Sequence, residues 1–489
     1  MKRLLSLFHV IGFALMLFAL TLFVPMGVAA YQQDGTLHAF AEAFVLALLL
    51  GAVPFFLTRA HQRELQARDG FLLVTLVWTV LPLVATLPLV IYFREAGEPI
   101  AFSLLYFETM SGLTTTGATA LQGLDTLPPA INVWRATLMW IGGMGILVLA
   151  VAILPMLGVG GSQVVRAETP GPMKDEKLTP RIASTAKGLY AVYLGISVLC
   201  FGAYAATGMH FIDAYVHMAA TVSLGGFSSY DSSFAAFDSV AVEIVAIVFM
   251  LICAVSFATH FNAVRQRSLG AYLRCPEARY VLAILLGSGL AISAWLWATE
   301  VYTSPTEALR FGMFNTISVA TTTGFANTDY AAWPIVAPLA MILLSCFTAS
   351  SGSTGSGIKL VRLLLIIKQT RVELRRVLHP RLVAPIQVSK RIVDSRVLLA
   401  LMAFLMLYVV SIGLIAFLLL LTGLDPATAI SAAVASINNL GPGLGMVGPA
   451  GNFAAFEGLQ VWLCTFGMLL GRLELVTVLV LLTPSFWRH

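Results

Sequence analysis

Residues 111–118 read SGLTTTGA, and three later stretches repeat this pattern of small, oxygen-bearing and glycine residues. Aligned on one glycine each, they read ATVSLGGF over 220–227, SVATTTGF over 318–325 and ASINNLGP over 435–442. The aligned residues lie 109, 98 and 117 positions apart, at Gly117, Gly226, Gly324 and Gly441. Each interval has room for a spanning helix, a loop and another helix. The sequence therefore predicts one supersecondary unit repeated four times.

The composition around these repeats indicates a membrane protein. Of 489 residues, 58% are hydrophobic and 11% charged, and the mean hydropathy is +0.88. Soluble domains carry about 25% charged residues, so a water-soluble fold is excluded. Ten apolar segments of spanning length lie near 4–26, 40–58, 71–93, 133–158, 188–207, 239–261, 280–299, 334–370, 397–422 and 459–483. Four shorter stretches, which predict re-entrant half-helices, lie near 100–114, 211–223, 305–321 and 426–438.

The predicted architecture is an all-α polytopic membrane protein with two amino-terminal helices and four helix, re-entrant loop, helix repeats around a central pore. The apolar stretch 4–28 is too long for a signal peptide, so we expect it to be retained. Re-entrant backbone is tolerated at membrane depth only inside protein or beside water, which implies a shared aqueous site. The predicted divisions are 1–65 for the two extra helices and 66–175, 176–274, 275–390 and 391–489 for the repeats.

Basic residues gather in alternate loops, within 59–68, 166–187, 265–279 and, most densely, 359–396. The intervening loops contain only Arg94, Arg135 and Arg310. By the positive-inside rule both termini are expected in the cytoplasm. The net charge of +5 is therefore a topology signal, and we expect no nucleic-acid partner. Attraction to lipid headgroups remains an alternative role for 359–396.

The loop residues have the chemistry of a cation filter. Glycine reaches φ values closed to other residues, so successive carbonyls can turn inward and replace an ion's hydration shell. Small residues six positions before each glycine permit close helix approach. The alternative is that these residues only mediate packing. The candidate ion-binding residues are Thr114, Thr115, Thr116, Gly117, Ser223, Leu224, Gly225, Gly226, Thr321, Thr322, Thr323, Gly324, Asn438, Asn439, Leu440 and Gly441.

A polar stretch, TASSGSTGSGIK over 348–359, interrupts a long apolar segment of the third repeat. Its hydroxyl groups and glycines are unsuited to an apolar helix and need pore water or protein partners. A phosphate-binding loop is disfavoured because Ile358 stands where that motif needs lysine. A passive helix break remains the alternative to a gate. The candidate gate residues, within an intramembrane loop over 348–358, are Ser350, Ser351, Gly352, Ser353, Thr354, Gly355, Ser356 and Gly357.

Three further polar residues lie at membrane depth. Arg472 lies within the last apolar segment, where a charge costs at least about 2.5 kcal/mol, so it is expected to face the pore or a partner. Glu474 is two positions away and points to another face. A structural ion pair with a different helix is the alternative for Arg472. Glu108 and His217, in the first and second half-helices, are expected to hold the loops rather than contact an ion.

The segments SGLTTTGAT, SLGGFSSYDSSF, ATTTGFANTDY and NNLGPGLG resemble the four filters of the Trk/Ktr/HKT superfamily of cation transporters. The resemblance covers nearly the whole chain and is greatest to bacterial Trk-type potassium-uptake pore subunits. It implies potassium uptake across the bacterial inner membrane. In that family a serine at the first filter glycine is associated with sodium permeation, and Gly117 occupies that place here. The resemblance also makes 348–358 and Arg472 a gate below the filter.

The same resemblance implies a homodimer in the lipid bilayer that binds a cytosolic RCK-type regulatory subunit. This sequence contains no nucleotide-binding domain, so ATP or NAD is expected to act only through that partner. We expect no covalently bound cofactor, with K⁺ as the transported ligand. A sodium or mixed cation transporter on the same scaffold is the main alternative. An intramembrane enzyme is disfavoured because the scattered histidines offer no paired catalytic residues.

Overall fold

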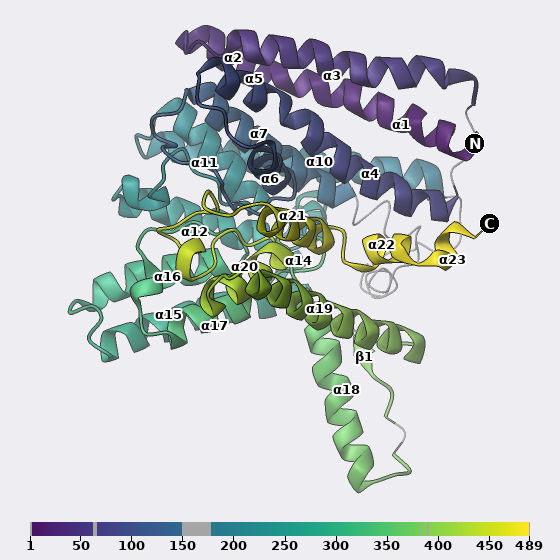
Figure 1. Cartoon of the computed structure of the whole chain (residues 1–489). Coiled ribbons are helices and arrows are strands. Elements are labelled where there is room, and N and C mark those ends of the chain that lie inside the picture. Colours follow the sequence, from purple (N-terminus) through teal and green to yellow (C-terminus); the bar gives the residue numbers. More distant parts are fainter. Residues whose placement is uncertain (1, 62–65, 149–177, 383, 389–390, 489) are drawn as a thin grey trace.

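The computed structural model describes residues 2–61, 66–148, 178–382, 384–388 and 391–488 (Figure 1). Its regular structure is helical throughout these ranges, except for one pair of strands of two residues each, β1 (Gln387–Val388) and β2 (Arg391–Ile392). In this antiparallel pair Gln387 lies opposite Ile392. The all-α class expected from the composition is therefore confirmed.

Two amino-terminal helices pack against each other along one edge of the molecule (Figure 1). The first runs through α1 (Lys2–Ala19), η1 (Leu20–Leu22) and α2 (Phe23–Gln32), and the second is α3 (Leu37–Leu57). They meet glycine to glycine, because a Cβ on Gly12 would lie 2.6 Å from the carbonyl oxygen of Gly51, and one on Gly51 would lie 2.8 Å from that of Gly12. Small residues permit such close approach between membrane helices.

Four helix, half-helix, helix units follow. Their first helices are α4 (Ala67–Ala85) with α5 (Leu87–Glu95), α10 (Leu178–Ala206), α15 (Pro276–Ala298) and α19 (Ser395–Leu421). Their half-helices are α6 (Phe102–Leu113), α11 (Phe211–Ser223), α16 (Pro305–Ala320) and α20 (Pro426–Asn438). Their second helices begin as α7 (Pro129–Val148), α12 (Val240–Ala254), α17 (Val336–Ser345) and α21 (Leu459–Arg472).

The other short elements lie within these units, between them or after the last one. They are η2 (Arg59–His61), η4 (Ser233–Ala236), α13 (Phe257–Gln266), α14 (Gly270–Arg274), η5 (Tyr330–Ala332), η6 (Gly445–Val447), α22 (Val476–Leu479), η7 (Val480–Leu482) and α23 (Pro484–Trp487). The long helix α18 (Leu360–Leu378) projects away from the body of the molecule, and the chain returns through β1 and β2 to α19 (Figure 1).

Six helices of the described residues are long and apolar enough to cross a membrane, and up to eight if each bent pair is one span. The ten segments expected from hydropathy include two that the structure bends sharply. The predicted span 239–261 breaks between α12 and α13 at 91°, and 459–483 breaks between α21 and α22 at 109°. Residues 149–158 of a third predicted span, and the predicted division at 175, lie outside the described residues.

Both bends have a backbone cause that hydropathy does not report. At the first, the carbonyl of Ala254 accepts from the amide of Ser350, and the amide of Phe257 donates to the carbonyl of Gly352, so the loop of the third repeat satisfies the broken helix. At the second, the backbone of Glu474 and Leu475 has positive φ, of 55° and 50°, although neither residue is glycine. Neither break contains a glycine or proline, although Gly471 lies near the end of α21.

Candidate functional site

The four half-helices end in the same hydrogen-bond pattern. In each, the amide of the residue before the aligned glycine donates to the carbonyl five residues earlier, on the small residue noted in the sequence. These bonds are 2.8 to 2.9 Å long and join Thr116 to Ser111, Gly225 to Ala220, Thr323 to Ser318 and Leu440 to Ala435. This six-to-one bond is half of a Schellman motif. The helix ends therefore repeat as the sequences do.

The Schellman motif also includes one residue in the left-handed helical conformation, which is usually glycine. In all four loops this residue is not a glycine. Two positions before each aligned glycine, φ is 51°, 53°, 63° and 49°, at Thr115, Leu224, Thr322 and Asn439. A left-handed conformation costs an ordinary residue roughly 1–2 kcal/mol. Four such residues at matching positions show that the turn is held by its surroundings, and strain of this kind concentrates at functional sites.

The aligned glycines also have positive φ, of 82°, 79°, 86° and 91° in chain order. A Cβ on each glycine would run into the carbonyl oxygen of the residue before the glycine of the next repeat. In order round the molecule the pairs are Gly117 with Gly225, Gly226 with Thr323, Gly324 with Leu440, and Gly441 with Thr116. The glycine of the fourth loop therefore meets the first loop, which closes the series of contacts. The four loops therefore form a closed ring in which glycines and carbonyls alternate.

The side chains three positions before the glycines form hydrogen bonds within the protein and do not point to the ring as free ligands. The hydroxyls of Thr114, Ser223 and Thr321 donate to helix carbonyls at 2.7 to 2.8 Å. Asn438 instead donates to Ser345 at 3.0 Å. All four are fully buried. Backbone carbonyls, rather than these side chains, are the oxygen atoms that the ring brings together.

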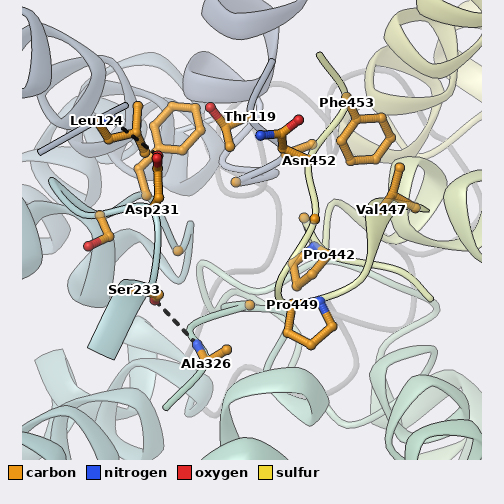
Figure 2. Close-up of a pocket in the computed structure, with 18 of the residues that line it drawn as sticks. Thr119, Leu124, Asp231, Ser233, Ala326, Pro442, Val447, Pro449, Asn452 and Phe453 are labelled. Carbon is orange, nitrogen blue, oxygen red and sulfur yellow. Dashed lines mark hydrogen bonds between the residues drawn. The ribbon is translucent and has the colours of Figure 1, made fainter. Parts of the chain in front are cut away.

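A cavity of about 360 Å³ adjoins the ring. All four aligned glycines line it, together with the segments that follow them, and Figure 2 shows residues from separate parts of the chain surrounding this space. Carboxylate oxygens of Asp231 accept from the amides of Gly123 at 2.8 Å and Leu124 at 3.1 Å, while the hydroxyl of Ser233 accepts from Ala326 at 3.3 Å. These bonds join neighbouring repeats around the cavity, which we call the mouth of the ring.

Side chains nine positions before the glycines hold the segments after them. Glu108 accepts from the amide of Ala120 at 2.7 Å, and His217 lies 2.9 Å from the hydroxyl of Ser228. This is the loop-holding role expected for both. Asn315, which was not identified from the sequence, has the same role in the third repeat and donates to Asn327 at 2.6 Å. Its place nine before Gly324, matching Glu108 and His217, was an available signal.

In the fourth repeat the corresponding residue is Ala432, which has no polar side chain. The preceding residue, Ser431, holds the segment after the glycine instead. The hydroxyl of Ser431 lies 2.8 Å from the amide of Leu444, which donates to it. The fourth half-helix also has an acidic cap, since Asp425 accepts from the amide of Thr428 at 3.0 Å. Hydrogen bonds from Thr428 hold the pKa of the exposed Asp425 carboxyl below its usual range. The cap therefore stays charged at neutral pH beside the half-helix N-terminus.

The three arginines expected in loops lie in helices instead, with Arg94 in α5. Arg135 is in α7 and Arg310 in α16, and both form ion pairs. Arg310 bonds to Glu243 of α12 at 2.9 Å, which joins the second and third repeats. The small number of arginines in these segments indicated only the topology. A count of charges does not tell whether an arginine has a buried carboxylate partner.

The polar loop of the third repeat lies against the inner ends of the second and third half-helices. The Thr354 hydroxyl donates to the carbonyl of Val222 at 3.1 Å, and the Ser356 amide donates to the hydroxyl of Thr322 at 3.1 Å. Gly355 lies so close that a Cβ there would be 3.2 Å from the carbonyl oxygen of Thr321. The loop therefore contacts the residues that immediately precede the ring.

Arg472 reaches this loop from the end of α21. Its guanidinium donates to the carbonyl of Thr354 at 3.3 Å, to the hydroxyl of Ser356 at 3.2 Å and to the carbonyl of Gly142 at 3.1 Å. The side chain is buried, and no carboxylate bonds to it within the described residues. Glu474 pairs with Arg362 at 2.5 Å instead. A positive charge thus lies under the ring, held by loop oxygens.

The comparison with protein families settles which group this chain falls into. The family model described as "TrkH: Cation transport protein" matches residues 36–488. The chain belongs to the TrkH family. Its fold class, with half-helices between longer apolar helices, agrees with that family, and the chain is a multi-pass membrane protein of the transport class rather than an enzyme.

Named TrkH proteins are similar over nearly their full length. "Trk system potassium uptake protein TrkH" of Halomonas elongata is 42% identical over 480 residues, covering 98% of both chains. The Escherichia coli K12 protein of that name is 41% identical over 481 residues, covering 98% of this chain and 99% of its own. The "Crystal Structure of the Potassium Transporter TrkH from Vibrio parahaemolyticus" matches with TM-score 0.91 at 40% identity, covering 99% of this chain and all of that one.

Proposed function

We propose that this protein takes up potassium through the ring formed by its four loops. The observation that carries the proposal is the closed order of contacts, in which each glycine meets the carbonyl of the next repeat. Four carbonyl dipoles around one axis replace the hydration shell of a dehydrated cation. The half-helices also aim their carboxyl ends at this region, which favours cations over anions. The carbonyls of Thr116, Gly225, Thr323 and Leu440 are the ion ligands of this plane.

Potassium is favoured over sodium by the glycine at the first loop and by the relatives. The TrkH proteins of Halomonas elongata and Escherichia coli are named potassium uptake proteins. Gly117 retains the residue whose replacement by serine is associated with sodium permeation in the family that the loops resemble. A sodium or mixed cation pathway is the outcome that would displace this assignment.

The loop over 348–358 and Arg472 form the gate of the pathway. Support comes from the bonds that place Thr354 and Ser356 against the second and third half-helices. Arg472 adds a buried positive charge beside the same loop, and such a charge opposes the passage of a cation. A conducting state requires the loop and this guanidinium to move off the axis together.

The protein resides in the bacterial inner membrane with both termini cytoplasmic. The start of α1 and the end of α23 lie on the same side of the molecule, which agrees with this orientation (Figure 1). The division into residues 1–65 and repeats 66–175, 176–274, 275–390 and 391–489 follows the order of helices, since each repeat then contains one half-helix.

The protein works as a homodimer with a cytosolic RCK-type subunit. The names of the relatives include the words "Trk system", which agrees with a multi-component complex. We expect the purified pore protein alone to bind neither ATP nor NAD at micromolar concentrations in isothermal titration calorimetry. Nucleotide should bind only after the regulatory subunit is added, and tight binding to the pore protein alone would contradict this arrangement.

Cation flux into proteoliposomes tests the proposal. Purified protein should take up potassium and rubidium and exclude sodium and lithium, with protein-free liposomes as the background. A second series with an imposed proton gradient determines whether uptake is coupled. Equal sodium and potassium flux would assign a nonselective cation pathway. Absence of flux both with and without the regulatory subunit would contradict the proposed transport.

A further inference from the structure

One ion pair lies at the mouth of the ring. The guanidinium of Arg135 donates to Glu108 at 2.8 Å, and both side chains are buried, at 1% and 0% exposure. Arg135 is also among the residues that line the cavity. A buried charge without a partner is strongly unfavourable, so each of these residues requires the other.

The pair joins the segments that follow two glycines. Arg135 donates to the carbonyl of Ser228, two residues after Gly226, at 3.0 Å. It also donates to the hydroxyl of Thr119, two residues after Gly117, at 3.1 Å. Glu108 accepts from that hydroxyl at 3.0 Å. One guanidinium and one carboxylate therefore fix the exit segments of the first and second repeats relative to each other.

The second repeat performs the holding task with His217, which bonds to Ser228, and the third and fourth repeats use uncharged groups. Asn315 bonds to Asn327, and Ser431 bonds to Leu444, so neither places a charge beside the cavity. Among these four equivalent contacts, only the one in the first repeat uses an arginine and a carboxylate to hold the segment after the glycine. A positive charge beside a cation pathway is harmful unless it is cancelled, which gives the carboxylate a second role besides hydrogen bonding.

We propose that Glu108 is a positioning residue that holds Arg135 and cancels its charge at the mouth of the pathway, so that the pair aligns the first two loops without repelling the incoming cation. The proposal rests on the proposed cation pore. Its distinguishing consequence is an asymmetry. Loss of either partner removes the same contact, but only loss of the carboxylate leaves a positive charge beside the cavity.

The test compares Rb⁺ uptake by Glu108→Gln, Arg135→Gln and the double variant in proteoliposomes. Glu108→Gln should lower uptake about tenfold because a unit charge near the path raises the barrier to a cation. The loss should shrink as ionic strength rises, since salt screens the charge. Arg135→Gln and the double variant lose the aligning contact but leave no positive charge, so each should keep at least about threefold more uptake than Glu108→Gln. Glu108→Asp, which keeps the charge, should recover most of the lost uptake.

Controls separate this proposal from misfolding and from failure of the proposed function. Glu243→Gln and Arg310→Gln break an ion pair between the second and third repeats that does not line the cavity. These two variants should have the same uptake, whether the charge removed is negative or positive. Melting temperatures identify unstable variants. Equal losses in Glu108→Gln and Arg135→Gln, or no recovery in the double variant, would overturn the charge-cancelling role. A wild-type protein without cation flux would instead overturn the proposed function.

If Glu108→Gln does not fold, the remaining variants still decide the matter. The double variant and Arg135→Gln must then conduct, because neither leaves an uncancelled positive charge. Failure of both to conduct while they remain folded would overturn the proposal.

Discussion

Replacing Gly117 by serine is expected to raise sodium uptake relative to potassium uptake by about tenfold, the equivalent of about 1.4 kcal/mol in discrimination. A Cβ on Gly117 would overlap the carbonyl oxygen of Gly225, so this carbonyl must move. The backbone there, at φ 82°, is also unfavourable for serine. Because the four loops form one ring, displacement of one carbonyl changes the site for the dehydrated ion and weakens its preference.

The measurement is uptake of sodium and potassium by proteoliposomes containing equal amounts of each protein. Gly413→Ser is the matched control, because a Cβ on Gly413 would meet nothing within 4 Å. It should leave the ratio unchanged. An unaltered potassium preference in folded Gly117→Ser would remove Gly117 from the account of selectivity.

Shortening the loop of the third repeat should raise uptake in the absence of any regulatory subunit by about tenfold or more, since it shifts the population toward the open state. Deletion of residues 352–355 removes Thr354, whose hydroxyl bonds to Val222, and one carbonyl that holds Arg472. The proposed gate then loses its contact with the second half-helix, and Arg472 loses one of the three oxygens that hold it.

Arg472→Gln provides a second route to the same result, because it removes the charge and keeps the loop. Basal rubidium uptake is measured for both variants, with Arg396→Gln, at an exposed arginine, as the control. If folded forms of both variants conduct as slowly as wild type, the loop is a passive bend in the helix and the gate lies elsewhere.

The repeats, the two extra helices and the positions of the four glycines were predictable because each leaves a local signature in the sequence. Small residues and glycine recur at fixed spacing, and the glycines do take positive φ. The closed ring was less predictable, since it depends on which carbonyl each glycine faces. That information belongs to contacts between residues about a hundred positions apart.

Other features were hidden for physical reasons that can be named. The left-handed conformation of Leu224 has no sequence signal, because leucine rarely adopts it and is held there by the surrounding fold. The bend near Glu474 has no glycine or proline at residues 473–475, where the backbone turns. Arg135 was read as a loop charge because its partner, Glu108, lies 27 residues away on another helix.

The most direct test of the central claim is to locate the ion. Crystals of the protein grown in rubidium should give an anomalous peak on the axis of the ring, surrounded by the carbonyl oxygens of Thr116, Gly225, Thr323 and Leu440. The peak should vanish when rubidium is replaced by sodium. A rubidium peak outside the ring, with none among these four carbonyls, would contradict the account.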